Sequence, residues 1–244
     1  MLKYPISTLL YLAKINIQDT IKDALKLKNN IDVRLTITVK DKDGKIIKQH
    51  KQHSHSFIRN FMTILASAFS ANTFYDYQTT NNLWYSVDPN YTTIFNELNT
   101  QDSSNDASFG IVVGTGTATP TATDYTLGNQ IPNGTGSGQL SYGASSISPG
   151  NSSVSPASSL SSPVQTLTPS GNTTSIQISR TFQNNSGSSI TVTETGIIVQ
   201  TASFYNGTST ATTKVLIVHD LLSSSITIQN SAVLTIVYTI SVTT

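Results

Sequence analysis

The chain has 244 residues, of which 37% are hydrophobic and only 11% are charged. A typical soluble domain carries about 25% charged residues, so this composition excludes the highly charged chains that stay disordered. The length suits one large β domain or one domain with an arm. Cysteine is absent, which excludes disulfides and thiolate metal sites.

The charges are unevenly distributed along the chain. Residues 1–60 hold 12 of the 14 Lys and Arg residues but only 5 of the 13 Asp and Glu residues. This basic segment could face nucleic acid, an acidic protein surface or a membrane, but a solvated helix and hairpin explain it more simply. We therefore do not favour a nucleic-acid contact. We also predict no membrane span, because no apolar run reaches the roughly 18 residues that a bilayer requires.

Residues 1–30 are predicted to form an amphipathic helical arm. Apolar residues recur at spacings of three and four over residues 6–28, and Asn29-Asn30 ends the pattern. A single amphipathic helix cannot bury its own apolar stripe. The arm is therefore expected to dock on this chain or on a neighbouring copy.

Residues 31–107 are predicted to form a module of hairpin, helix and aromatic loop. Ile31–Lys40 alternates apolar and polar side chains as a strand does, and Asp43-Gly44 favours a tight turn before a partner strand over Ile46–His53. A second helix follows, capped by Ser54 or Ser56, and we expect it to be mostly buried because it carries few charges. Residues 72–107 are rich in Tyr and Trp and are interpreted as a long loop, of the kind that often forms a functional surface.

Residues 108–244 are predicted to form an antiparallel β-sandwich, Ig-like or jelly-roll-like. Short alternating segments separated by polar turns are typical of this class. The segment 144–163 interrupts the pattern; ten of its twenty residues are Ser, and we interpret it as an exposed Ser/Pro-rich loop. The candidate strands are 108–113, 138–142, 164–168, 174–183, 189–200, 214–222 and 225–242. In the fifth, Gly196 shifts the apolar alternation and predicts a bulge.

Two charged residues lie on apolar strand faces. Arg180 follows Ile176 and Ile178 at even spacing, and Glu194 follows Ile190 and Val192 in the same way. If residues 174–200 form a hairpin that is symmetric about Gly187, Arg180 lies directly opposite Glu194. An inward Arg and Glu are far less costly together than either is alone, which predicts a structural ion pair.

The search for reactive groups yields only weak patterns. His50, His53 and His55 have a spacing that could suit a metal, but no carboxylate or Cys accompanies them, and whether they bind metal stays open. His219 and Asp220 are neighbours that point to opposite faces of a strand. Six glycosylation sequons start at Asn90, Asn133, Asn151, Asn172, Asn184 and Asn206, and chance explains most of them in so polar a chain.

Two loop patterns are also incomplete. Asp102, Asn105 and Asp106 lack the order of a calcium loop. Gly114-Thr115-Gly116 lacks the third glycine and the lysine of a nucleotide-binding loop. We therefore predict no cofactor, and we assign no catalytic, cofactor-binding or metal-binding residue.

A resemblance to known proteins lies in four segments: His55–Phe61, Phe109–Ile131 (FGIVVGTGTATPTATDYTLGNQI), Ile178–Ile197 (ISRTFQNNSGSSITVTETGI) and Val218–Val242. They resemble segments of the virion structural and tail-associated β-sandwich proteins of tailed phages and archaeal viruses. These segments comprise 75 of the 244 residues, and their shared motifs are turns, strand alternation and a glycine bulge. The resemblance implies virion assembly, an oligomeric ring or spike, or host contact, and it carries no catalytic residue.

The sequence therefore predicts a non-enzymatic structural component of a virus particle, such as a tail, adaptor or vertex protein that acts as one of several copies. Its partners would be copies of itself and other virion proteins. The alternative is a receptor- or glycan-binding fibre domain that serves host attachment. A binding function predicts a concave aromatic patch, whereas an assembly function predicts flat, extended interfaces. A wall-degrading glycosidase is the third hypothesis, and no pair of carboxylates supports it.

Overall fold

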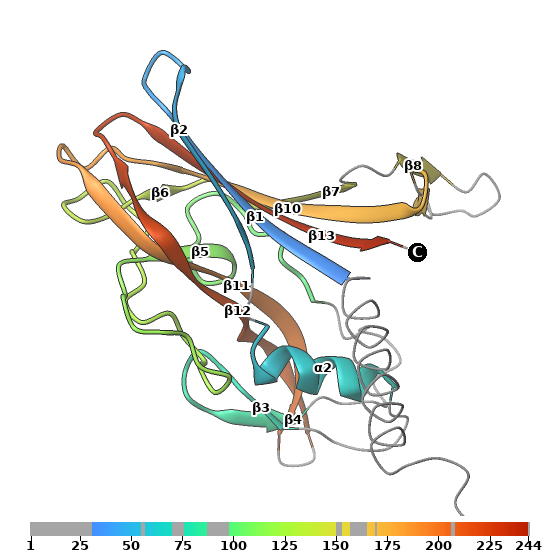
Figure 1. The fold of residues 1–244 in the computed structure, drawn as a ribbon. Helices are drawn as coiled ribbons and strands as arrows, with labels where there is room; N and C mark the ends of the chain where they lie inside the picture. Colours follow the sequence, from blue (N-terminus) through green and yellow to red (C-terminus); the bar gives the residue numbers. More distant parts are fainter. Residues whose placement is uncertain are drawn as a thin grey trace, which may run out of the picture. The chain divides into compact units, whose positions relative to one another are not determined.

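The computed structural model describes residues 31–54, 57–69, 76–86, 98–149, 153–156, 165–168, 170–205 and 208–243. These residues form a mainly β protein with antiparallel sheets, as the sequence predicts (Figure 1). The predicted helix over residues 6–28 lies outside the described residues. The chain divides into two compact units; the larger comprises Val33–Ser148 and Gln177–Thr239, and the smaller includes Pro149–Ile176 and Ile240–Thr244.

The first sheet has the strand order β2–β1–β13–β10–β6, and β7 also pairs with β10. Its strands are β1 (Ile31–Lys40), β2 (Ile46–His53), β6 (Ser141–Tyr142), β7 (Ser146–Pro149), β10 (Thr173–Gln183) and β13 (Val233–Thr243). The predicted alternation of β1 is confirmed, because Leu35, Ile37 and Val39 are fully buried while the residues between them are not.

The predicted β1–β2 hairpin is also confirmed. Its turn closes with the Gly44 N–H donating to the Asp41 carbonyl at 3.0 Å, and Gly44 has a φ of 82°, which glycine adopts at little cost. The sequence places this hairpin in a separate module, but β1 pairs with β13 near the end of the chain. The buried stripe of β1 therefore joins the core that β13 and β10 also line.

The second sheet has the order β12–β11–β4–β3, and β5 also pairs with β11. Its strands are β3 (Asp76–Gln78), β4 (Trp84–Ser86), β5 (Gly110–Gly114), β11 (Ile190–Tyr205) and β12 (Thr208–Ile228). All five residues of β5 are buried; β5 pairs with β11, and its Val113 carbonyl accepts the Ile131 N–H at 2.9 Å from the following loop. The β11–β12 register shifts between Val192 and Glu194 and again between Ile197 and Ile198, so irregularities flank Gly196.

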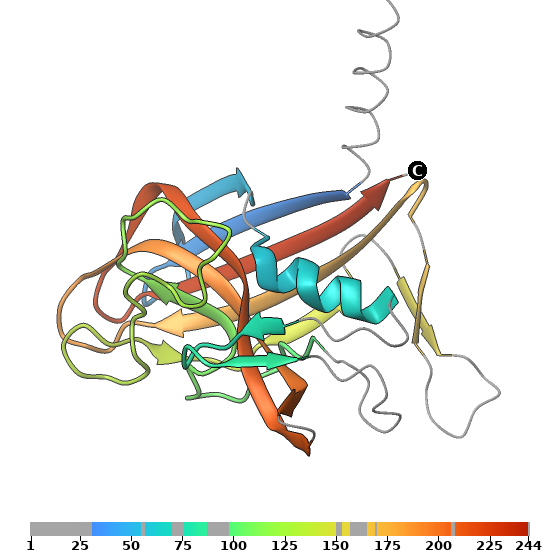
Figure 2. The same ribbon diagram turned by 90° about the horizontal axis from the view of Figure 1, so that it is seen from below.

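The helix α2 (Arg59–Phe69) packs against β12 and β3 (Figure 2). Asn60 anchors it, since the Asn60 amide donates to the carbonyls of Gln78 and Leu216 at 2.9 and 3.2 Å. The expectation of a mostly buried helix is wrong, because Met62 is 57% exposed and Leu65 is 37% exposed. Ser54 does not cap it; its hydroxyl donates to Asp220 instead.

The Ser/Pro-rich segment is not a loop throughout. It contains β7 and also β8 (Ser153–Pro156), which pairs with β9 (Gln165–Thr168) in a two-stranded sheet of the smaller unit. The predicted strand 225–242 is divided as well: β12 continues to Ile228, and a turn with Ser231 at a φ of 68° precedes β13. Within the described ranges, no helix has the length and apolar character needed to cross a membrane.

Candidate functional site

Arg180 and Glu194 do not form the predicted pair. Arg180 lies on β10 in the first sheet, and Glu194 lies on β11 in the second sheet. The turn at residues 184–188 carries the chain from one sheet to the other instead of closing a hairpin. The buried Asn184 side chain holds this turn by donating to the carbonyls of Ser188 and Ile228 at 2.7 and 2.8 Å, so its sequon is inaccessible in the folded protein.

Arg180 instead organises the loop that precedes β5. Its side chain is fully buried and forms an ion pair with Asp102 at 3.3 Å. The guanidinium also donates to the carbonyls of Gly143 and Phe109, both at 2.8 Å, and to that of Asp106. Its carbon lies 4.7 Å from the centre of the Tyr142 ring. The acidic loop that faintly resembles a calcium site is thus folded around an arginine.

Glu194 forms a second buried cluster with His219 and loop 115–129. Gly196 lies opposite His219 in the β11–β12 register, so His219 and Glu194 project from the same face of the sheet. The Glu194 carboxylate accepts the backbone N–H groups of Gly116, Gly128 and Asn129 at 2.8–2.9 Å, and it contacts His219 Nε2 at 2.9 Å. His219 Nδ1 lies 2.7 Å from the Asp124 carboxylate in the same loop.

The ionisation of this cluster follows from its hydrogen bonds. Burial alone would raise the pKa of Glu194, but the hydrogen bonds from His219 and from three backbone N–H groups outweigh burial and lower the pKa to about 2. Burial likewise opposes charge on His219, but its bonds to Glu194 and Asp124 prevail and raise its pKa. Each ring nitrogen of His219 contacts a carboxylate, and these two contacts hold the loop in place. No ring nitrogen is left to act as a base.

Glycines make this close approach to Glu194 feasible. A Cβ at Gly116 would lie within 2.7 Å of three carboxyl atoms of Glu194, and one at Gly114 would also meet that carboxylate. The glycine pair that suggests a nucleotide-binding loop thus serves to admit a buried carboxylate. Sequence reasoning missed this role, although glycines at 114, 116 and 128 were its one visible signal.

We expect Gly116→Ala to destabilise the protein by about 1–3 kcal/mol, because the new methyl group must displace the Glu194 carboxylate. Chemical denaturation of the full chain measures the loss. Gly44→Ala is the matched control, since its site is open and only the positive φ opposes alanine. A Gly116→Ala variant as stable as the wild type would contradict the packing described for Glu194.

The other possible reactive groups in the sequence, the histidines of the hairpin and Asp220, do not come together in one site. His50 contacts Gln52 and Ser223, whereas His53 lies opposite Arg34 on the other face of the hairpin. His55 is outside the described residues. Asp220 accepts hydrogen bonds from Ser54 and from the buried Tyr238, on the face of β12 opposite to His219. Among the described residues, no group of three His, Asp or Glu side chains is arranged to hold a metal ion.

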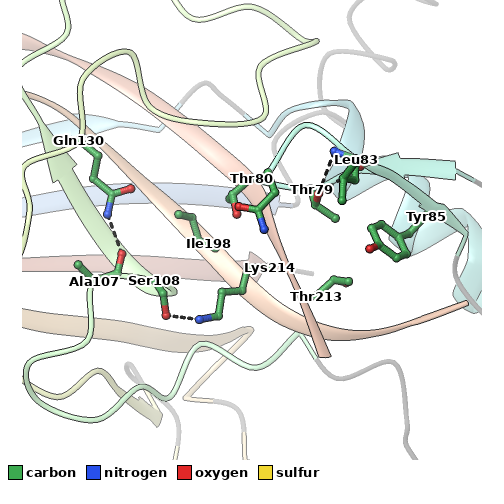
Figure 3. A pocket seen from close by; sticks show the side chains of 11 residues that line it. Thr79, Thr80, Leu83, Tyr85, Ala107, Ser108, Gln130, Ile198, Thr213 and Lys214 are labelled. Carbon is green, nitrogen blue, oxygen red and sulfur yellow. Dashed lines mark hydrogen bonds between the residues drawn. The ribbon is translucent and has the colours of Figure 1, made fainter. Parts of the chain in front are cut away.

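A pocket of about 560 Å³ among the described residues is a concave site that a ligand could occupy. It lies within the larger unit, between the β3–β4 turn, residues 107–108 and the middle of β11 and β12 (Figure 3). Its size is that of pockets that bind small molecules, about 300–1,000 Å³. The residues that line it are mostly polar: Thr79, Thr80, Asn81, Leu83, Tyr85, Ala107, Ser108, Gln130, Ile198, Thr213 and Lys214.

Hydrogen bonds fix the walls of this pocket. The Thr79 hydroxyl donates to the Leu83 carbonyl at 3.1 Å and closes the β3–β4 turn. The Thr80 N–H donates to the Lys214 carbonyl at 3.0 Å and ties that turn to β12. Gln130 donates to the Ala107 carbonyl at 2.6 Å on the opposite wall. No sequence signal indicates this pocket, because its walls come from separate segments that are spread from Thr79 to Lys214.

Comparison with known proteins does not extend this description: no family model, no curated protein and no solved structure matches the chain.

Proposed function

We propose that this chain is a non-enzymatic structural component of a virus particle, a tail, adaptor or vertex protein that acts in assembly as one of several copies. Its location would be the virion, and its partners would be copies of itself and other virion proteins. Many weak contacts between copies would provide the binding strength through avidity. The resemblance of segments such as Phe109–Ile131 to virion proteins supports this proposal.

The observation that carries the proposal is the outer face of the first sheet. Its centre is neutral: Thr235 and Val237 of β13, Thr36 and Thr38 of β1 and Ser179 of β10 alternate with buried residues and remain half-exposed. Arg34 and Lys40 lie on the same face toward the two ends of β1, and the neutral centre between them suits a flat protein interface, because few charges need to be desolvated when a partner covers it. We further propose that the two sheets form an Ig-like or jelly-roll-like sandwich with this face on its outside.

The buried charges favour a structural role over catalysis. Arg180 and Glu194 use their hydrogen-bonding groups to hold loops, and His219 offers no free nitrogen. A general acid or base needs access to a substrate, which these groups lack. An attachment domain that binds a host receptor or glycan is the second candidate, and the pocket beside Lys214 favours it.

An image reconstruction of the intact particle tests the location directly, with repeated density for this chain as the expected result. A charge on the sheet face tests the interface. We expect Val237→Glu to weaken self-association of the full chain at least tenfold, because an unpaired charge at an interface costs about 1.4 kcal/mol or more. Sedimentation over a range of concentrations measures this.

Met62→Glu is the control for the sheet-face variant, since it places the same charge on an exposed apolar residue of α2. It should associate like the wild type, and both variants should keep the wild-type circular dichroism. A wild-type chain that is a monomer at high concentration and also in the particle would disprove the proposal. If Val237→Glu and the wild type associate equally strongly, the interface between copies lies on another face.

A further inference from the structure

The pocket contains a single cation that is not neutralised within it. Lys214 is the one charged residue of its lining, and no carboxylate lines it. The ammonium donates to the Ser108 hydroxyl and lies 5.5 Å from the centre of the Phe109 ring (Figure 3). An ammonium has three N–H donors. One donor engages Ser108, and Lys214 forms no ion pair with a described residue.

The nearby acidic residue does not occupy the pocket. Asp106 is close enough to Lys214 for an electrostatic interaction, but its carboxylate accepts the Ser108 N–H at 2.7 Å and lies outside the lining. Lys214 is therefore a partly buried cation whose remaining donors face a space of about 560 Å³. A partly desolvated cation of this kind attracts an anion more strongly than an exposed lysine does.

The other groups of the pocket suit a ligand that carries many hydroxyls. Thr80 and Asn81 line the pocket from the β3–β4 turn and form its rim here, and Gln130 lines it from a separate loop. The Tyr85 ring forms one side, and Ile198, which is 2% exposed, contributes an apolar patch. A lining that combines amides, hydroxyls and an aromatic ring matches a sugar, which has polar edges and an apolar face.

We propose that this pocket binds a carboxylate-bearing sugar, with the carboxylate on Lys214 and the ring hydroxyls on the amides and hydroxyls of the rim. This inference rests on the second candidate function, attachment to a host surface, and it names the class of receptor. The hydrogen bonds that fix the β3–β4 turn and Gln130 hold the pocket in its binding shape. Little ordering entropy then opposes binding of even a single sugar.

Ligand-observed NMR with the full chain tests the proposal with three matched probes. Glucuronate carries both the carboxylate and the sugar ring, glucose carries the ring alone, and acetate carries the carboxylate alone. We expect glucuronate to bind at least about tenfold more tightly than either, because a charge-assisted hydrogen bond adds to the sugar contacts. Lys214→Met should remove this preference, whereas Lys51→Met, an exposed lysine of β2, should leave it unchanged.

A second variant separates recognition from folding. Lys214→Arg keeps the charge and should retain a preference for glucuronate, and the melting temperature of each variant shows whether the fold persists. Equal binding of glucose and glucuronate, a preference that survives Lys214→Met, or no binding of any probe would overturn the acidic-sugar assignment. The attachment function is tested separately, by measuring whether the fluorescently labelled chain binds to intact host cells. If the chain attaches through another surface, this binding is still observed even when any of the three results above overturns the acidic-sugar assignment.

Discussion

Replacement of Arg180 by Met is expected to lower the free energy of unfolding by about 3–5 kcal/mol, the cost of breaking a buried ion pair by removal of one partner. The substitution leaves the buried Asp102 carboxylate without its ion-pair partner. It also leaves the carbonyls of Gly143, Phe109 and Asp106 without their hydrogen-bond donor. A methionine side chain fills similar space but donates no hydrogen bond. Chemical denaturation of the full chain measures the difference.

The controls for Arg180 distinguish charge from geometry. Arg34→Met makes the same substitution on the exposed face of β1, and surface charges contribute about 0–1 kcal/mol. Arg180→Lys keeps the charge but has too few donors for the carbonyls, so it should fall between the wild type and Arg180→Met. If Arg180→Met proves no less stable than Arg34→Met, Arg180 does not organise the loop before β5.

Replacement of Glu194 by Gln is expected to destabilise the protein by about 3 kcal/mol near pH 6, the free energy that corresponds to lowering a pKa from 4.5 to about 2. Because the folded pKa of Glu194 is depressed, its contribution is present above pH 4.5 and is lost as pH falls toward 2. The melting temperature of the wild type should therefore decline across this range. The variant should lack the part of this decline that Glu194 causes.

His219 produces the opposite dependence on pH. Its folded pKa is raised, so its contribution is complete below about pH 6.5, the ordinary pKa of histidine, and is lost as pH rises through the raised value. Loop 115–129 should therefore be held most firmly between about pH 4.5 and 6.5, where Glu194 and His219 are both charged. Hydrogen exchange at Gly116 and Gly128 measures this locally. Protection that is the same at pH 5.5 and pH 9 would contradict the role of the imidazolium.

The strands could be predicted because alternation is a local signal. β1 buries every second residue from Val33 to Val39, and the same alternation covers Ile178–Phe182 of β10 and Leu234–Tyr238 of β13, so the sequence displays the pattern directly. Which sheet a strand joins is not local. The turn after Gln183 has the same residues whether the chain reverses within one sheet or crosses to another, and so the pairing of Arg180 with Glu194 was wrong.

The partners of the buried charges were hidden for a different reason. Arg180 and Glu194 bind mainly backbone carbonyls and N–H groups, which every residue carries and which leave no pattern in a sequence. Their loops, 102–111 and 115–129, have no periodicity to guide a prediction. Charged residues are few in this chain, so the sequence did indicate that each charge on an apolar strand face has a structural role. In the structure, Arg180 binds the loop 102–111 and Glu194 binds the loop 115–129.

Among the described residues, β2 lies at an edge of the first sheet, and this position bears on how copies of the chain can contact one another. A free edge strand offers unpaired backbone groups to any other strand and can seed fibrillar aggregation. Lys48 and Lys51 lie on this strand and Lys45 precedes it, so two such edges that approach each other would bring like charges together. These lysines therefore disfavour edge-to-edge stacking of copies into amyloid-like ribbons, and they do not oppose contact through the neutral centre of the sheet face.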